Sequence, residues 1–194
     1  MAELAQRRPP VIASTDWLKL LPPAGRWVLH GGPGARALAA PVWGAAFSEE
    51  ACRAIVAGSR ATLWLGPDEF LLLDLGPDDG SSGESRATVP QDLEGALAGA
   101  PHALVDVSHR QFALEISGAH ATTILSGACP LDLDARAFPV GMCTRTVLAK
   151  ADVVLWRTGQ SSFHLEVWRS FAAYVSGLLG EIAREFYGET QPPP

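Results

Sequence analysis

The amino-acid sequence carries one order of local patterns twice, and this repetition is the strongest constraint on the fold. In the first half, the pattern predicts a strand at residues 26–30, a glycine-rich turn and a short helix at 35–40. Ser48, followed by two glutamates, is typical of a helix N-terminus, so we expect a second helix that Gly58 ends. A hairpin over residues 61–73 completes this half.

The second half repeats this order. A strand at residues 112–116 leads into a Ser-Gly turn and a helix at 119–125, which Gly127 ends. A hairpin follows, with strands at 153–156 and 163–168. A Leu-Trp pair, a turn glycine and a phenylalanine recur at matching places in the two hairpins, so we expect the two halves to fold alike.

Each half also ends in a helix, at residues 91–98 and 170–187. The fold class that follows is α+β, built from duplicated β-α-β-β-α units with pseudo-twofold character. We expect a single domain over residues 1–194, with pseudo-repeat halves at about 25–99 and 104–187. A glycine- and serine-rich loop at 76–90 joins the halves and is expected to be flexible, and both ends of the chain are proline-rich arms.

The last helix has the clearest pattern of any single element. Its apolar residues recur at i, i+3, i+4 and i+7, which is typical of a helix that packs one face against a sheet. The predicted face comprises Phe171, Tyr174, Val175, Leu178, Leu179, Ile182 and Phe186.

Composition excludes several classes of protein. Hydrophobic residues make up 47% of the chain and charged residues 19%, which excludes an intrinsically disordered protein. The net charge of −6 and the absence of a long basic run argue against a nucleic-acid partner. The 15 basic residues are 13 arginines and two lysines. Arginine suits interfaces better than lysine, so this ratio favours a subunit of a larger assembly, although an ordinary compact domain is compatible with it.

The sequence also predicts the compartment. No segment approaches the ~18 uninterrupted apolar residues of a membrane span, and residues 1–10 lack the apolar run of a secretory signal. Cys52, Cys129 and Cys143 form no C-x-x-C pair. We therefore expect a cytoplasmic protein with free, mostly buried thiols and no membrane partner.

Two segments invite a catalytic or ligand-binding interpretation. Residues 31–34 form a glycine-rich turn between a strand and a helix, where main-chain amides could bind a phosphate, but the motif lacks Gly-Lys-Ser/Thr and a tight structural turn is favoured. Asp106, Ser108 and His109 combine the residue types of a catalytic triad. On a strand, however, Asp106 and Ser108 point away from the face of His109, so we expect a structural strand end instead.

The five histidines show no metal-ligand spacing, and we expect no metal site. The strand at 163–168 is more informative, because its alternation places His164, Glu166 and Trp168 on one face, with Arg169 following. Tryptophan beside arginine is typical of an interface anchor, so these four residues are the interface candidates. The alternative is that a helix of the same chain covers Trp168.

Several motifs carry a resemblance to known families. The sequence Val-Asp-Val-Ser-His at 105–109, followed by a strand at 112–116, Gly118 and a helix, resembles the aminomethyltransferase (T-protein) of the glycine cleavage system. A further set resembles the gamma subunit family of heterotetrameric sarcosine oxidase. This set lies at residues 66–72, 129–133, 136–139, 144–146, 154–159 and 163–170.

The resemblance implies a fold like the T-protein folate-binding domain and a complex that oxidatively demethylates sarcosine to glycine. It also implies that FAD, FMN, NAD and tetrahydrofolate belong to the partner subunits, and that alpha, beta and delta subunits are the partners. Where the T-protein has a glycine-rich turn with paired acids, this chain has residues 149–154 with Asp152 alone. We therefore transfer no folate site to this chain. Since no triad and no metal-ligand spacing is found either, we assign no catalytic, cofactor-binding or metal-binding residue to it.

Two functional hypotheses follow, from different classes of protein. The first is a structural, non-catalytic subunit of a sarcosine oxidase, and the alternative is a small folate-binding or folate-dependent one-carbon transfer protein. A phosphate-binding module at residues 31–34 is a third, weaker interpretation.

Overall fold

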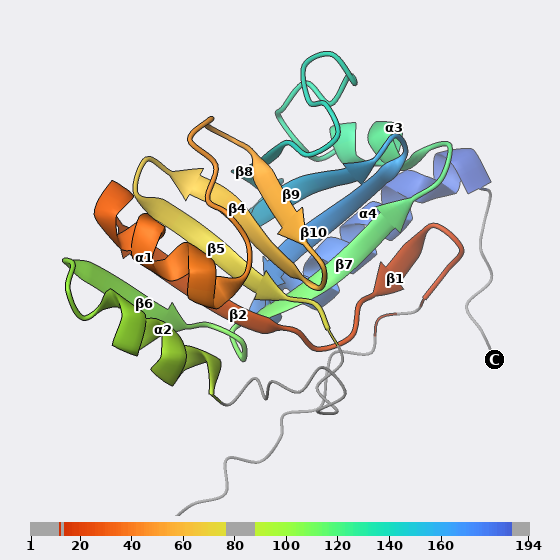
Figure 1. The fold of residues 1–194 in the computed structure, drawn as a ribbon. Helices are drawn as coiled ribbons and strands as arrows, with labels where there is room; N and C mark the ends of the chain where they lie inside the picture. Colours follow the sequence, from red (N-terminus) through yellow and green to blue (C-terminus); the bar gives the residue numbers. More distant parts are fainter. Residues whose placement is uncertain (1–11, 13, 77–87, 188–194) are drawn as a thin grey trace, which may run out of the picture.

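The computed structural model describes residue 12 and residues 14–76 and 88–187. Most of the expected linker and both proline-rich arms lie outside these described residues. Within them, ten strands form two antiparallel sheets of five strands each (Figure 1). The first sheet contains, in spatial order, β3 (Ala54–Ala57), β4 (Arg60–Gly66), β5 (Glu69–Asp74), β2 (Gly25–Gly31) and β6 (His102–Asp106). The second contains β8 (Cys143–Leu148), β9 (Ala151–Gly159), β10 (Ser162–Trp168), β7 (Gln111–Ser117) and β1 (Leu18–Leu20).

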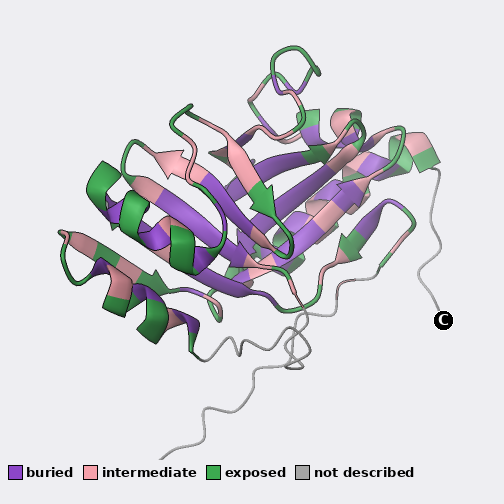
Figure 2. Cartoon of the chain, in the orientation of Figure 1, coloured by how far each residue is buried: buried purple, intermediate pink, exposed green. Residues whose placement is uncertain are grey.

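The two sheets are the inner layers of a four-layer structure. Helices α1 (Pro33–Trp43) and α2 (Val89–Leu97) pack on the outer face of the first sheet, around Trp27, Leu29 and Phe70. Helices α3 (Ala121–Ser126) and α4 (Ala172–Tyr187) pack in the same way on the second sheet. The inner faces meet each other, so the central strands are buried on both sides (Figure 2).

The strand order confirms the duplication. Counted from the β3 and β8 ends, the two sheets correspond strand for strand, with β4, β5 and β2 matching β9, β10 and β7. The strand that precedes each half pairs with the sheet of the other half: β1 lies beside β7, and β6 lies beside β2. Each half therefore supplies one edge strand to the sheet of the other half. This exchange was not predicted from the sequence.

The helix expected between Ser48 and Gly58 is wrong. Ser48 Oγ accepts a hydrogen bond from the N–H of Glu50 at 3.1 Å, which makes a local turn, and the chain then enters strand β3. Because serine followed by acids stabilises such turns as well as helix N-termini, the local pattern did not distinguish them. Gly58, with a φ of 59°, occupies the tight turn that joins β3 to β4.

The other expected helices are present. The predicted apolar face of the last helix is partly correct: Val175 and Leu179 of α4 are buried, whereas Tyr174 is exposed. Phe171 is also exposed and belongs to a short 3-10 helix, η1 (Arg169–Phe171), that precedes α4. The small residues Ala172 and Ala183 lie in the contact with the second sheet instead. The helix therefore approaches the sheet closely and is rotated relative to the prediction.

Candidate functional site

The interface between the two sheets is formed mainly by apolar side chains. Leu63 and Leu71 of the first sheet and Val154 and Trp156 of the second belong to one buried cluster. Burying such side chains stabilises the fold by about 1.5–3 kcal/mol each, which holds the sheets face to face.

A network of buried ion pairs lies within the interface between the sheets. Arg26 Nε of β2 donates a 2.7 Å hydrogen bond to Glu166 Oε2 of β10, and Arg26 Nη1 donates to the carbonyl of Ala24 at 3.0 Å. On the other side of the carboxylate, His164 Nε2 lies 2.8 Å from Glu166 Oε1. The side chains of Arg26, His164 and Glu166 are all buried, so the network links the two halves inside the core.

The environment of Glu166 keeps its carboxyl group ionised. Burial is the largest single influence and acts to raise the pKa of Glu166. The hydrogen bond from His164, the charges of Arg26 and His164 and the hydrogen bond from Arg26 together outweigh it. The pKa of Glu166 therefore lies below its ordinary value of 4.5. An ionised Glu166 compensates the buried charge of Arg26.

The predicted alternation of β10 is confirmed, but part of the interface prediction drawn from it is not. Phe163 and Val167 face the helices, while His164 and Glu166 face the opposite way. That opposite face meets the first sheet of the same chain, which leaves Glu166 0% and His164 4% exposed. The two residues are therefore unavailable to a partner, because alternation along a strand distinguishes two faces without showing what covers each.

Trp168, at the end of β10, is 43% exposed. The guanidinium of Arg110 lies over its ring, 4.9 Å from the ring centroid. Arg169 turns to another ring, with its guanidinium 4.7 Å from the centroid of Phe112. No helix in the described ranges covers Trp168, so Trp168 and Arg169 remain the candidates for contact with a partner.

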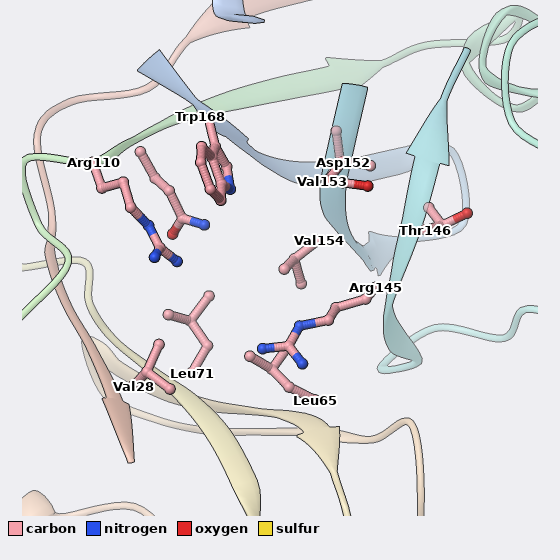
Figure 3. A pocket seen from close by; sticks show the side chains of 11 residues that line it. Val28, Leu65, Leu71, Arg110, Arg145, Thr146, Asp152, Val153, Val154 and Trp168 are labelled. Carbon is pink, nitrogen blue, oxygen red and sulfur yellow. The ribbon is translucent and has the colours of Figure 1, made fainter. Parts of the chain in front are cut away.

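A cleft of about 310 Å³ opens between the sheets beside Trp168 (Figure 3). The residues that line it come from seven separate segments of the chain. They are Val28, Leu65, Leu71, Arg110, Gln111, Arg145, Thr146, Asp152, Val153, Val154 and Trp168. No sequence pattern indicates this set, because strands that are distant in the chain converge there.

The cleft has an ion pair on one side. Arg145 of β8 donates to Glu69 of β5 through both terminal guanidinium nitrogens, Nη1 and Nη2, with Arg145 Nη1 2.8 Å from Glu69 Oε2. The hydrogen bond from Arg145 lowers the pKa of Glu69. The pair bridges the two sheets beside the cleft, and each charge is compensated by the other.

Asp106, Ser108 and His109 do not form a catalytic triad. Strand β6 ends at Asp106, whose Oδ1 accepts the N–H of Ser108 at 2.8 Å. Ser108 Oγ accepts the N–H of Arg26 at 2.9 Å. Both side chains hold the main chain at a strand end, as predicted.

The glycine-rich turn at residues 31–34 serves the packing of β2 against α1. A Cβ on Gly31 would lie 2.7 Å from Cβ of Ala35, closer than two carbons can approach. Gly32 is the N-cap of α1, and Pro33 begins the helix. The close contact between Gly31 and Ala35 explains why this turn needs glycine.

Other side chains offer little reactive chemistry. Cys129 and Cys143 are buried and Cys52 is partly exposed, and all three are free thiols. Burial raises the pKa of Cys143 to about 12. Among the described residues, no three histidine, cysteine, aspartate or glutamate side chains group closely enough to hold a metal ion. None of the helices in the described ranges is both long and apolar enough to cross a membrane.

Comparison with protein families adds the decisive observation. The model of the family described as "Sarcosine oxidase, gamma subunit family" matches residues 31–185, which is most of the chain. The chain belongs to the sarcosine oxidase gamma subunit family. The resemblance that the motifs indicated is therefore confirmed.

Curated members of this gamma subunit family align with the chain over much of its length. The sarcosine oxidase subunit gamma of Corynebacterium sp. (strain P-1) is 37% identical over 138 residues, covering 70% of this chain and 64% of that protein. The subunit gamma of an Arthrobacter species is 39% identical over 135 residues, covering 69% of this chain and 62% of that protein. The aligned segment thus spans less than two thirds of these relatives.

Solved structures with a similar fold include a chain of a sarcosine oxidase and an aminomethyltransferase. A chain of the heterotetrameric sarcosine oxidase from Corynebacterium sp. U-96, in complex with pyrrole 2-carboxylate, superposes with a TM-score of 0.78 at 30% identity, covering 90% of this chain and 86% of that one. The aminomethyltransferase T of the glycine cleavage system from Bartonella henselae superposes with a TM-score of 0.58 at 13% identity, covering 84% of this chain and 44% of that one. The expected T-protein-like fold is confirmed.

Proposed function

We propose that this chain is the accessory gamma subunit of a heterotetrameric sarcosine oxidase, the enzyme that oxidatively demethylates sarcosine to glycine. Its membership of the gamma subunit family, over residues 31–185, carries the proposal. In this assembly the chain is a structural component, and the partners are the alpha, beta and delta subunits. FAD, FMN, NAD and tetrahydrofolate are bound by those partners.

The geometry supports a structural role. Three ion pairs form where the sheets meet: Arg26 with Glu166, Glu166 with His164, and Arg145 with Glu69. The first and the last of these pairs join the two sheets and fix their relative position. At the same time Trp168 presents an exposed ring held by Arg110, and tryptophan and arginine are the residues that contribute most at protein interfaces.

Co-expression tests the proposal. The alpha, beta and delta subunits are produced with and without this chain, and the complexes are measured by size-exclusion chromatography and by sarcosine-dependent peroxide production. We expect a stable heterotetramer and full oxidase activity only when this chain is present. Assembly and full activity without it would refute the structural role.

The alternative, a folate-binding module, is tested with the same chain on its own. We expect that titration with tetrahydrofolate, measured by isothermal calorimetry, shows no binding at micromolar concentrations. Asp152, the remaining acid at residues 149–154, is exposed at the cleft, and the substitution Asp152→Asn serves as the control. Micromolar binding that this substitution abolishes would favour the folate-binding alternative.

A further inference from the structure

The cleft beside Trp168 contains a cation with no carboxylate partner among the described residues. Arg110 lies over the Trp168 ring and, within the described chain, forms no ion pair. The nearby carboxylate of Glu69 is engaged by Arg145 through two nitrogens. Asp152 lies across the cleft from Arg110 (Figure 3). Arg110 is thus held in place by the tryptophan ring while its donors remain available.

The side chain of Gln111, next to Arg110 in the chain, has a buried oxygen without a hydrogen bond among the described residues. Gln111 also lines the cleft and is only 7% exposed, yet its Oε1 atom is buried and accepts no hydrogen bond within the described chain. Buried polar atoms are usually paired, because an unpaired one loses its hydration without compensation. Rotation of the amide about its last bond exchanges the oxygen and nitrogen, so Gln111 can accept from or donate to an occupant of the cleft.

Apolar side chains line the cleft between its polar groups. Val28 and Leu71 from the first sheet and Val154 from the second line it. A volume of about 310 Å³ corresponds to roughly ten water molecules at ~30 Å³ each, which is room for one large side chain and part of a main chain. A stretch of polypeptide meets all three requirements: a carboxylate for Arg110, a main-chain amide for Gln111 and an apolar side chain for the walls.

We propose that this cleft receives an acidic segment of a partner subunit, with an aspartate or glutamate that pairs with Arg110 and an adjoining apolar side chain that enters between the sheets. This inference rests on the proposed function, since it names the chemistry by which the chain recognises its partner. Trp168 forms the rim of the site and Gln111 binds the main chain of the segment. The pairing is charge-assisted and fixed in geometry, so it selects the register of the partner as well as contributing affinity.

Carbodiimide cross-linking tests the proposal in the assembled complex. The substitution Arg110→Lys places a primary amine in the cleft, which the reagent joins only to a carboxylate in direct contact. We expect a cross-link between this chain and an aspartate or glutamate of a partner subunit, identified by mass spectrometry of the joined peptides. The exposed Arg136, changed in the same way, is the matched control and should give no such product.

Substitutions that remove the contacts complete the test. Arg110→Gln and Gln111→Leu should each weaken binding of the partner subunits at least tenfold, measured with folded variants of unchanged circular dichroism, and Arg136→Gln should not. A cross-link to Glu69 or Asp152 of this chain alone, or normal affinity of both cleft variants, would overturn the inference. Wild-type assembly is measured in parallel. If the wild-type chain does not assemble with the partner subunits, the proposed function is wrong. If it assembles and the cleft variants bind equally well, only the proposal for the cleft is wrong.

Discussion

Arg26 and Glu166 are 140 positions apart in the chain, and their side chains meet at 2.7 Å between the two sheets. Each residue comes from a different half of the duplicated fold, and both are buried. A buried pair of this kind contributes less to stability than its Coulomb attraction indicates, because both ions lose their hydration. Its consequence is specificity: a sheet arrangement that separated the pair would leave an uncompensated charge in the core.

Glu166→Gln should therefore be strongly destabilising. The substitution leaves the buried Arg26 cation without a counter-ion, and such changes cost about 3–5 kcal/mol. Urea unfolding of the full chain, followed by circular dichroism, measures the effect. Glu181→Gln is the control, because Glu181 forms an exposed pair with Arg184 and should leave the free energy of unfolding nearly unchanged. Equal stability of the two variants would contradict the role assigned to the network.

Stability should also depend on pH through Glu166. Its pKa in the folded protein lies below the ordinary value of 4.5, so its contribution is fully present above pH 4.5 and is lost as the pH falls through the folded pKa. The difference in free energy of unfolding between wild type and Glu166→Gln should thus shrink on acidification below about pH 4.5. Unfolding curves from pH 7 to pH 3 measure this. A difference that stays constant over this range would show that ionisation of Glu166 is not what stabilises the fold.

Substitution of two glycines in and after the turn between β2 and α1 should change the stability of the chain in opposite directions. Gly31→Ala should destabilise the chain by about 1–3 kcal/mol, because its Cβ would overlap that of Ala35, which cannot move without moving the helix. Gly34→Ala, three residues later and with nothing within 4 Å of its added Cβ, lies in the first turn of α1 and should stabilise it by about 0.5–1 kcal/mol. Thermal unfolding of the two variants compares them. Two effects of the same sign would contradict this account of the turn.

Trp168 should matter for assembly and little for folding. Trp168→Ala removes a 43% exposed ring and its contact with Arg110, and interface tryptophans typically contribute about 2 kcal/mol or more, so binding of the partner subunits should weaken about 30-fold. Biolayer interferometry with the immobilised chain measures the dissociation constant. Leu38→Ala, on α1 and equally exposed at 43%, is the control. Unchanged affinity for the Trp168 variant would exclude this face as the interface.

Sequence reasoning and structure agree where the pattern depends on neighbouring residues. The strands at 112–116 and 163–168, both hairpins and the last helix were predicted, because alternation and helical spacing are local properties. The helix expected after Ser48 failed for the same reason, since a serine followed by acids stabilises a turn as well as a helix end.

The cleft could not be predicted in this way. Arg110 and Gln111 were not singled out, because nothing in their immediate sequence marks them. They become a site only when the end of β10 brings Trp168 beside them and the first sheet supplies an apolar wall.

The sequence by itself determined that the chain consists of two related halves, which residues of each strand share a face, and to which family the motifs belong. Only the tertiary structure decided what each face meets. His164 and Glu166 lie on the same side of β10 as Trp168, yet the first sheet buries the former two and leaves the tryptophan exposed. The physical reason is that strand alternation is set by the backbone, whereas burial is set by sheet packing between segments far apart in the chain.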